Sequence, residues 1–353
     1  MKIRHELTPY FCETYGIDRD KDYPVEWVDS RTLLVSERLD LVAKLKYIEA
    51  RENGRITPFI RECYVKHIEA FSYGTFKESG SPEKDTIEKY FASFDQLIDA
   101  IKMSGFEKDK SVVPVGKDNV LLDGAHRVSA AIYFNKRVPI IRLAEAKVTY
   151  DAAYFRKRLL DRQCLDFLVI EYAKLRETVQ LAYVFPAIGP KLSYAQKLRK
   201  AINQEGKLIY SIKINPLKTS TGAFSSIFEN STLIKNPPNN HSPKSCSLYL
   251  FETVDKARSD AIQAHAQQLF QNSKYTRHFE TDPKKVRQQL MLLSSAGPNA
   301  QFPGNWIIAK NKQVYKWMVY KQRIWLLRSL KRLGLFTAFR KIYRGLRRNT
   351  LSK

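Results

Sequence analysis

The chain lacks the cysteine pattern of a secreted or zinc-stabilised protein. Its four cysteines, Cys12, Cys63, Cys164 and Cys246, include no Cys-x-x-Cys pair and no histidine at metal-ligand spacing, so the sequence predicts neither a disulfide framework nor a structural zinc site. No run reaches the ~18 apolar residues of a membrane span, and the first residues lack the apolar core of a signal peptide. We therefore expect a cytoplasmic protein that is not threaded through a bilayer.

Acidic residues are missing from the last part of the chain. None follows Asp282, whereas residues 310–353 contain 14 Lys or Arg. The formal net charge of the whole chain is +24, and most of the excess is C-terminal. A balance this basic is typical of proteins that meet a polyanion, such as nucleic acid, an acidic membrane surface or a phosphorylated ligand.

Length and composition predict a folded protein with more than one domain. The 353 residues exceed the ~100–200 of one domain, and 44% hydrophobic with 27% charged residues is ordinary for a globular chain. We expect an α/β (α+β) protein with four regions. They are an N-terminal domain at 1–150, a helical connector at 151–180, a second α/β domain at 181–305 and a basic amphipathic helical tail at 306–353.

In the N-terminal region, hydrophobic periodicity and turn residues predict a strand at 23–29, with Ser36 as the N-cap of a helix through 39–48. Further helices are expected at 57–71 and 93–104. The next segment predicts strands at 112–115 and 120–122, a tight turn, a helix and a strand at 138–143. Beyond it we expect a helical connector at 154–178, strands near 180–184 and 207–214, and a helix near 255–270.

The tight turn is the sequence Asp123-Gly124-Ala125-His126-Arg127, called here the Asp-Gly turn. A chain that passes from a strand into a helix needs the torsional freedom of Gly124, and the following helix N-terminus offers free N–H groups to an anion. Arg127 can reach back with a bidentate guanidinium, and His126 adds a donor whose charge can respond near neutral pH. Asp123 can hold a hydroxyl, a metal or Arg127. Asp-Gly is also a very common turn dipeptide, but the flanking strands and the small-residue helix favour a functional site.

The segment of about residues 25–145 resembles the ParB/sulfiredoxin-like superfamily, whose phosphate-binding turn has the form Gly-x-x-Arg. It is most similar to the branch written Asp-Gly-x-His-Arg, which includes ParB-like free-serine kinases. Sulfiredoxins need a cysteine where this chain has Ala125, so the resemblance does not extend to their repair chemistry. The DNA-partitioning members resemble Gly-Glu-Arg-Arg and carry a helix-turn-helix domain, which has no clear signal here.

The resemblance implies transfer of a phosphoryl group from ATP or ADP, with Mg²⁺, to a hydroxyl. It implies that backbone amides at Gly124, Ala125, His126 and Arg127 bind the phosphate and that Asp123 and His126 take part in catalysis. The family also places a glutamate near the first strand as the base. Glu37 is the main candidate and Glu26 a weaker one, while the alternative for Glu37 is an exposed acid at a helix N-terminus. His67 and His278 have no partner at ligand spacing, so we expect core or surface histidines.

The basic tail predicts a second partner. Phe336, Phe339, Tyr343 and Leu346 repeat at helical spacing with Lys and Arg on the other face, a pattern typical of a helix that lies on an anionic membrane. Nucleic acid is a less favoured partner, and a helix packed on its own protein would bury the same stripe. The first interpretation is therefore a bacterial-type phosphotransferase acting on a small-molecule or glycan hydroxyl, peripheral on the inner face of the cytoplasmic membrane. The alternatives are a non-catalytic ParB-like module that binds nucleotide or DNA, and a fold with a purely structural role.

Overall fold

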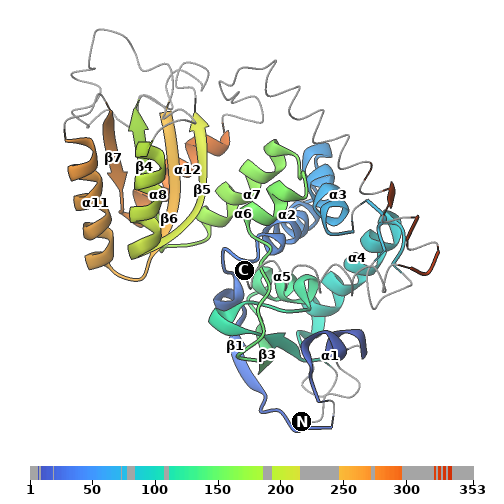
Figure 1. Cartoon of the computed structure of the whole chain (residues 1–353). Helices are drawn as coiled ribbons and strands as arrows, with labels where there is room; N and C mark the ends of the chain where they lie inside the picture. The colour runs from blue at the N-terminus through green and yellow to red at the C-terminus, as the bar shows by residue number, and fades with distance from the viewer. Residues whose placement is uncertain are drawn as a thin grey trace.

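A computed structural model describes residues 7, 9–18, 20–72, 74–77, 84–106, 111–185, 193–214, 246–271 and 275–295, together with 322, 325–326, 329–330 and 333–335. Helices and two separate sheets make up the described chain, so the expected mixed α/β class is confirmed. Figure 1 shows the larger sheet on one side and the smaller sheet, with its helices, on the other. Most of the tail lies outside the described residues.

The smaller sheet has the order β1-β3-β2. Its strands are β1 (Glu26–Asp29), β2 (Val113–Val115) and β3 (Arg137–Arg142). The central strand β3 runs antiparallel to β1 and parallel to β2. The segment 120–122, expected as a strand, makes a single bridge between Leu121 and Val115. The pairing does not extend further, because the Asp-Gly turn begins at the next residue.

Helices pack against this sheet and against one another. They are α1 (Pro9–Tyr15), α2 (Asp40–Glu52), α3 (Pro58–Ser72), α4 (Ile87–Ser104) and α5 (Ala125–Tyr133), with the short 3-10 helices η1 (Ser30–Leu33) and η2 (Lys117–Asn119). The helix expected at 93–104 begins earlier, because the Thr86 side chain accepts from the N–H of Lys89 and caps α4. The expected N-cap at Ser36 is wrong. Helix α2 starts at Asp40, and the buried Ser36 hydroxyl lies 3.5 Å from Glu252 instead.

Two helices, α6 (Ala152–Lys157) and α7 (Arg162–Lys174), occupy the segment expected as a helical connector. They lead into the second sheet, whose strands are β4 (Val179–Phe185), β5 (Gly206–Ile214), β6 (Cys246–Thr253) and β7 (Thr276–Glu280). All neighbours are antiparallel in the order β5-β6-β4-β7. With α8 (Ser193–Glu205) and α11 (Lys256–Phe270), the described elements follow a split βαβ arrangement.

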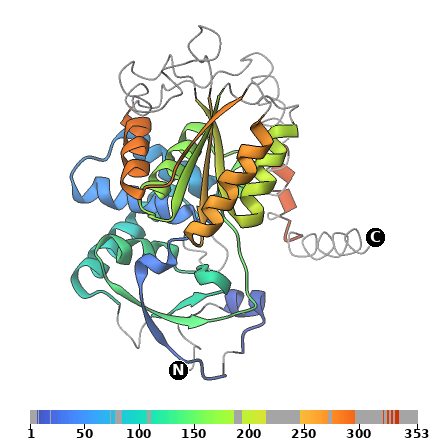
Figure 2. The ribbon, with the colours of Figure 1, turned by 90° about the vertical axis from the view of Figure 1, so that its left-hand side faces the viewer.

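Helices cover both faces of this second sheet, as the edge-on view in Figure 2 shows. Along β4, Leu181 and Tyr183 belong to the core shared with α7 and α12 (Pro283–Ser295), whereas Ala182 and Val184 pack with α8 and α11. Alternate strand residues point to opposite faces, so each face has its own apolar set. The core shared with α7 continues into α2 and the smaller sheet, so the two α/β regions are packed together.

Candidate functional site

The Asp-Gly turn joins the segment 120–122 to α5. Gly124 has a φ of +82°, in the left-handed region that favours glycine, and its N–H donates to Asp123 Oδ1 at 2.7 Å. No side chain caps α5. The first amides of a helix have no intrahelical acceptor, so those of Ala125, His126 and Arg127 face the space before the helix. These are the amides that the sequence analysis expected to meet an anion.

Arg127 is the third residue of α5, and its side chain folds back over the turn. A Cβ built on Gly124 would lie 2.9 Å from Arg127 Nη2, so the guanidinium rests directly on the glycine. Nη1 donates to Ser111 Oγ and lies 3.5 Å from the Val112 carbonyl oxygen. Burial lowers the pKa of Arg127, and the charge of Asp123 opposes that shift. The guanidinium is therefore positioned at the turn before any ligand binds.

The His126 ring lies between two aromatic side chains. Its Nε2 is 3.0 Å from the Tyr64 hydroxyl, and its ring centroid is 4.6 Å from that of Phe94. Burial, followed by the positive charges of Lys44 and Lys84, lowers the pKa of His126 well below its ordinary value. Burial and these charges therefore disfavour the protonated imidazole, which runs against the expectation of a charge that responds near neutral pH.

Beside the turn lies a buried charge cluster that the sequence analysis missed, formed by Arg38, Asp40, Lys44 and His67. The Arg38 guanidinium makes two 2.8 Å hydrogen bonds to the carboxylate of Asp40, and Lys44 Nζ donates to the same carboxylate at 3.1 Å. Lys44 Nζ also lies 3.2 Å from His67 Nε2. Burial raises the pKa of Asp40, but the charges of Arg38 and Lys44 outweigh it and hold the pKa far below its usual range.

Arg38 links this cluster to the turn. Its Nη1 donates to the carbonyl oxygen of Leu121, two residues before Asp123, and its positive charge interacts with Asp123. The i,i+4 spacing of Asp40 and Lys44 was the available sequence signal, since such pairs lie on one helix face. His67 is fully buried on α3, so the expected core histidine is confirmed, and its partner is Lys44.

The two glutamates considered as bases lie in ion pairs elsewhere. Glu37 is paired with Lys207 of the second sheet, and Glu26 is 2.7 Å from Arg142 on β3. Glu37 lies in a turn, in which the N–H of Arg38 donates to the carbonyl oxygen of Val35, and residues 37–38 also bond to the backbone of Tyr150. The two side chains have different partners: Glu37 pairs with Lys207 of the second sheet, whereas Arg38 contacts the Leu121 carbonyl oxygen beside the Asp-Gly turn.

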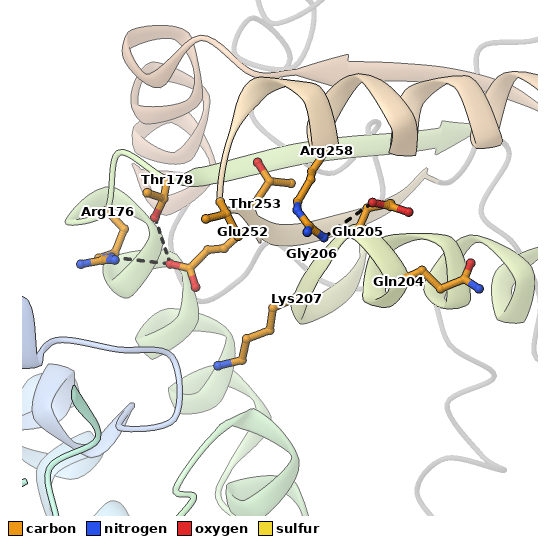
Figure 3. A pocket seen from close by; sticks show the side chains of 10 residues that line it. Arg176, Thr178, Gln204, Glu205, Gly206, Lys207, Glu252, Thr253 and Arg258 are labelled. Atoms are coloured by element: carbon orange, nitrogen blue, oxygen red, sulfur yellow. Dashed lines mark hydrogen bonds and ion pairs between the residues drawn. The ribbon is translucent and has the colours of Figure 1, made fainter. Parts of the chain in front are cut away.

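A cavity of about 380 Å³ lies where Glu37 meets the second sheet. It is lined by Arg176, Thr178, Gln204, Glu205, Gly206, Lys207, Glu252, Thr253, Val254 and Arg258. Figure 3 shows Glu252 at one side of it, contacted by Thr178 at 3.2 Å and Arg176 at 3.5 Å. None of the residues of the Asp-Gly turn lines this cavity. Residues 36–38 lie between the cavity and the Asp-Gly turn. Ser36 and Glu37 contact residues of the cavity, whereas Arg38 contacts the Leu121 carbonyl oxygen beside the turn.

Comparison of the chain with protein-family models, with curated proteins and with solved structures found no match. Within the described ranges, no group of three or more His, Cys, Asp or Glu side chains is placed to hold a metal ion. None of the helices in that part of the chain is long and apolar enough to cross a membrane. Conclusions about function therefore depend on the geometry of the Asp-Gly turn.

Proposed function

We propose that the chain is a nucleotide-dependent phosphotransferase that binds ATP or ADP at the Asp-Gly turn and transfers phosphate to a hydroxyl of a small molecule or glycan. The observation that carries the proposal is the guanidinium of Arg127 folded over Gly124, beside the free amides that begin α5. Backbone amides at a helix N-terminus together with an arginine fork are suited to a phosphate group.

The charges around the turn support an anionic ligand. Arg38, Lys44, Lys84 and Arg127 are the cations whose fields reach His126 or the turn, and the facing carboxylates are Asp40 and Asp123. Four cations against two carboxylates leave an excess of positive charge. Because phosphoryl transfer depends mainly on positioning and on neutralising phosphate charge, this excess is suited to the reaction.

Asp123 is the residue that would hold Mg²⁺. It is partly exposed and stands at the turn, whereas the carboxylate of Asp40 is already occupied by Arg38 and Lys44. Magnesium in phosphotransfer sites is often bound by one or two carboxylates together with the substrate phosphates, so one aspartate fits that pattern. When bound, the ion would neutralise negative charge on the phosphates.

The same residue is the better candidate for the general base. Asp123 is adjacent to the phosphate site, whereas Glu37 faces the second sheet and is paired with Lys207. If Asp123 is the base and does not hold Mg²⁺, Asp123→Asn lowers turnover ~100-fold or more and leaves nucleotide affinity nearly unchanged, whereas an equal loss of affinity would assign it to holding the metal or the ligand. Glu37→Gln is the comparison, and a larger loss of turnover there than in Asp123→Asn would reverse the assignment.

The central experiment incubates the full chain with radiolabelled ATP and Mg²⁺, and measures nucleotide affinity by calorimetry. Arg127→Ala should abolish binding and leave the circular dichroism spectrum unchanged; Arg127→Lys should also fail, because a point charge does not reproduce the fork. Arg142→Ala is a matched control, since it removes a guanidinium that pairs with Glu26 on the sheet surface. Unchanged affinity in Arg127→Ala would refute the site.

The alternative is a non-catalytic module that binds nucleotide or DNA. Catalysis would be helped by a second carboxylate beside Asp123. Among the described residues around the turn, the other carboxylates, Asp40 and Glu37, are already in ion pairs, which favours the non-catalytic alternative. The two functions separate in one measurement. Nucleotide binding with turnover supports the phosphotransferase, whereas nucleotide or duplex DNA binding without turnover supports the module.

We also propose that the C-terminal region docks on an anionic membrane. In the few residues described there, Trp325 is 70% exposed and Leu333 is 69% exposed, which places large apolar side chains in contact with water. Each basic residue near an acidic leaflet contributes on the order of 1 kcal/mol, so a fraction of the 14 charges suffices for adsorption. Removing residues after Trp306 should release the protein from anionic vesicles and spare nucleotide binding. Unfolding of the truncated chain would show instead that the tail packs on the protein.

A further inference from the structure

Two of the four cysteines lie against each other in the core. Cys63 on α3 and Cys164 on α7 have their sulfur atoms 2.7 Å apart, and the side chains are 2% and 1% exposed. A disulfide bond is about 2.05 Å long, so only a small approach of the two sulfurs would be needed to form one. The other two are elsewhere, Cys12 in the cluster around α1 and Cys246 on β6.

The pair has a defined donor and acceptor. The Cys63 thiol donates to the sulfur of Cys164, and this hydrogen bond, together with burial, raises the pKa of Cys63. Cys164 lies in the first turn of α7, where Asp161 caps the helix. The thiolate is the form of a cysteine that reacts with peroxide, and the hydrogen bond and burial of Cys63 disfavour the thiolate of that residue. Cys164 is therefore the sulfur suited to react first, with Cys63 as its resolving partner.

We propose that Cys63 and Cys164 are a redox-active thiol pair that hydrogen peroxide converts into a disulfide and a reductant restores. The Cys164 thiolate attacks one peroxide oxygen, which breaks the O–O bond, leaves a sulfenic acid and releases hydroxide. The sulfur of Cys63 then attacks Cys164; the S–S bond forms, the S–O bond breaks, and the departing hydroxide takes the proton of Cys63. Two thiols and one peroxide give one disulfide and two waters.

A small oxidant suits the site, because both sulfurs are buried and a bulky disulfide reagent has no direct approach. The bond would tie α3 to α7 across 101 residues of sequence. Helix α3 also carries Tyr64 and His67, which contact His126 and Lys44. The crosslink therefore reaches the helix that supports the candidate site, and it does not depend on the proposed function.

The test is peptide mapping of the folded full chain after treatment with hydrogen peroxide. Unreacted thiols are alkylated, and the protein is digested with trypsin without reductant. Trypsin cuts after Arg61 and Lys66, and after Arg162 and Lys174, so the expected product is peptide 62–66 joined to peptide 163–174 with the loss of two hydrogen atoms. Dithiothreitol should separate the peptides, and the oxidised protein should unfold at a temperature several degrees higher than the reduced protein.

Matched variants make the result specific. Cys63→Ser and Cys164→Ser should each abolish the crosslinked peptide, whereas Cys12→Ser and Cys246→Ser should form it normally. The wild-type measurement alone decides the matter if a variant fails to fold. Alkylation of both thiols in the peroxide-treated protein, a sulfinic acid at Cys164 without a crosslink, or a crosslink between other cysteines would each overturn the proposal.

Discussion

Substitution of Gly124 by alanine tests whether the turn positions Arg127. Two effects are expected from the structure. A φ of +82° costs an L-residue about 1–2 kcal/mol, and the new Cβ would lie 2.9 Å from Arg127 Nη2 and 3.3 Å from Cζ and Nε. The guanidinium has to shift, because real Cβ atoms essentially never lie this close to another heavy atom and the end of the arginine side chain is the part that can move.

The expected magnitudes follow from these two effects. The free energy of unfolding should fall by about 1–2 kcal/mol. Loss of charge-assisted hydrogen bonds from a displaced guanidinium is worth about 1.5–3 kcal/mol, so nucleotide affinity should fall ~10- to 100-fold. Urea unfolding measures the first quantity and calorimetric titration with ATP the second.

Gly54 provides a matched control for the backbone effect. It has a φ of +63° after α2, and a Cβ there would meet nothing within 4 Å. Gly54→Ala should therefore lose a similar amount of stability and bind nucleotide as the wild type does. Full nucleotide affinity in Gly124→Ala, or an equal loss of affinity in both variants, would refute the idea that contact with Arg127 makes the glycine necessary.

Three further predictions concern charge. Asp40→Asn should lower the free energy of unfolding by about 3–5 kcal/mol, because it leaves the buried Arg38 and Lys44 without their carboxylate. Asp99→Asn, which breaks an exposed ion pair, should cost under about 1 kcal/mol. Equal losses for the two variants in urea unfolding would contradict the role of the buried cluster. Burial raises the pKa of Asp166 to about 6 from 3.8. The folded state then binds the proton of Asp166 more tightly than the unfolded state, so the contribution of Asp166 to stability is greatest below pH 3.8 and is lost as the pH rises through about 6. Asp166→Asn should remove this contribution to the pH dependence and stabilise the protein at pH 7 by up to about 3 kcal/mol; an unchanged pH profile of the free energy of unfolding would contradict the assignment. The pH profile of turnover should show no step near pH 6.5 from His126, because the pKa of His126 lies well below that value. A step at that pH that disappears in His126→Gln would show that the ring is protonated in the complex.

The local part of the site was predictable because its signals are local. A glycine between a strand and a helix specifies the turn, and the position of Arg127 in the first helical turn follows from where that helix begins. Strands β4 and β5 of the second sheet were likewise predicted near their observed bounds. Strand β6 was missed because its run of apolar residues, Cys246–Thr253, is nearly continuous, and such a run does not show the alternation that marks a half-buried strand.

The direction of Glu37 was beyond sequence reasoning for a different reason. Residues 35–38 form a turn, and their apolar and polar types follow no regular pattern, so the sequence does not say which of these side chains faces the Asp-Gly turn. That choice is made by long-range partners: Lys207 attracts Glu37 from the second sheet, and the Leu121 carbonyl receives Arg38. The second sheet therefore holds Glu37 away from the Asp-Gly turn, although it supplies none of the residues of that turn.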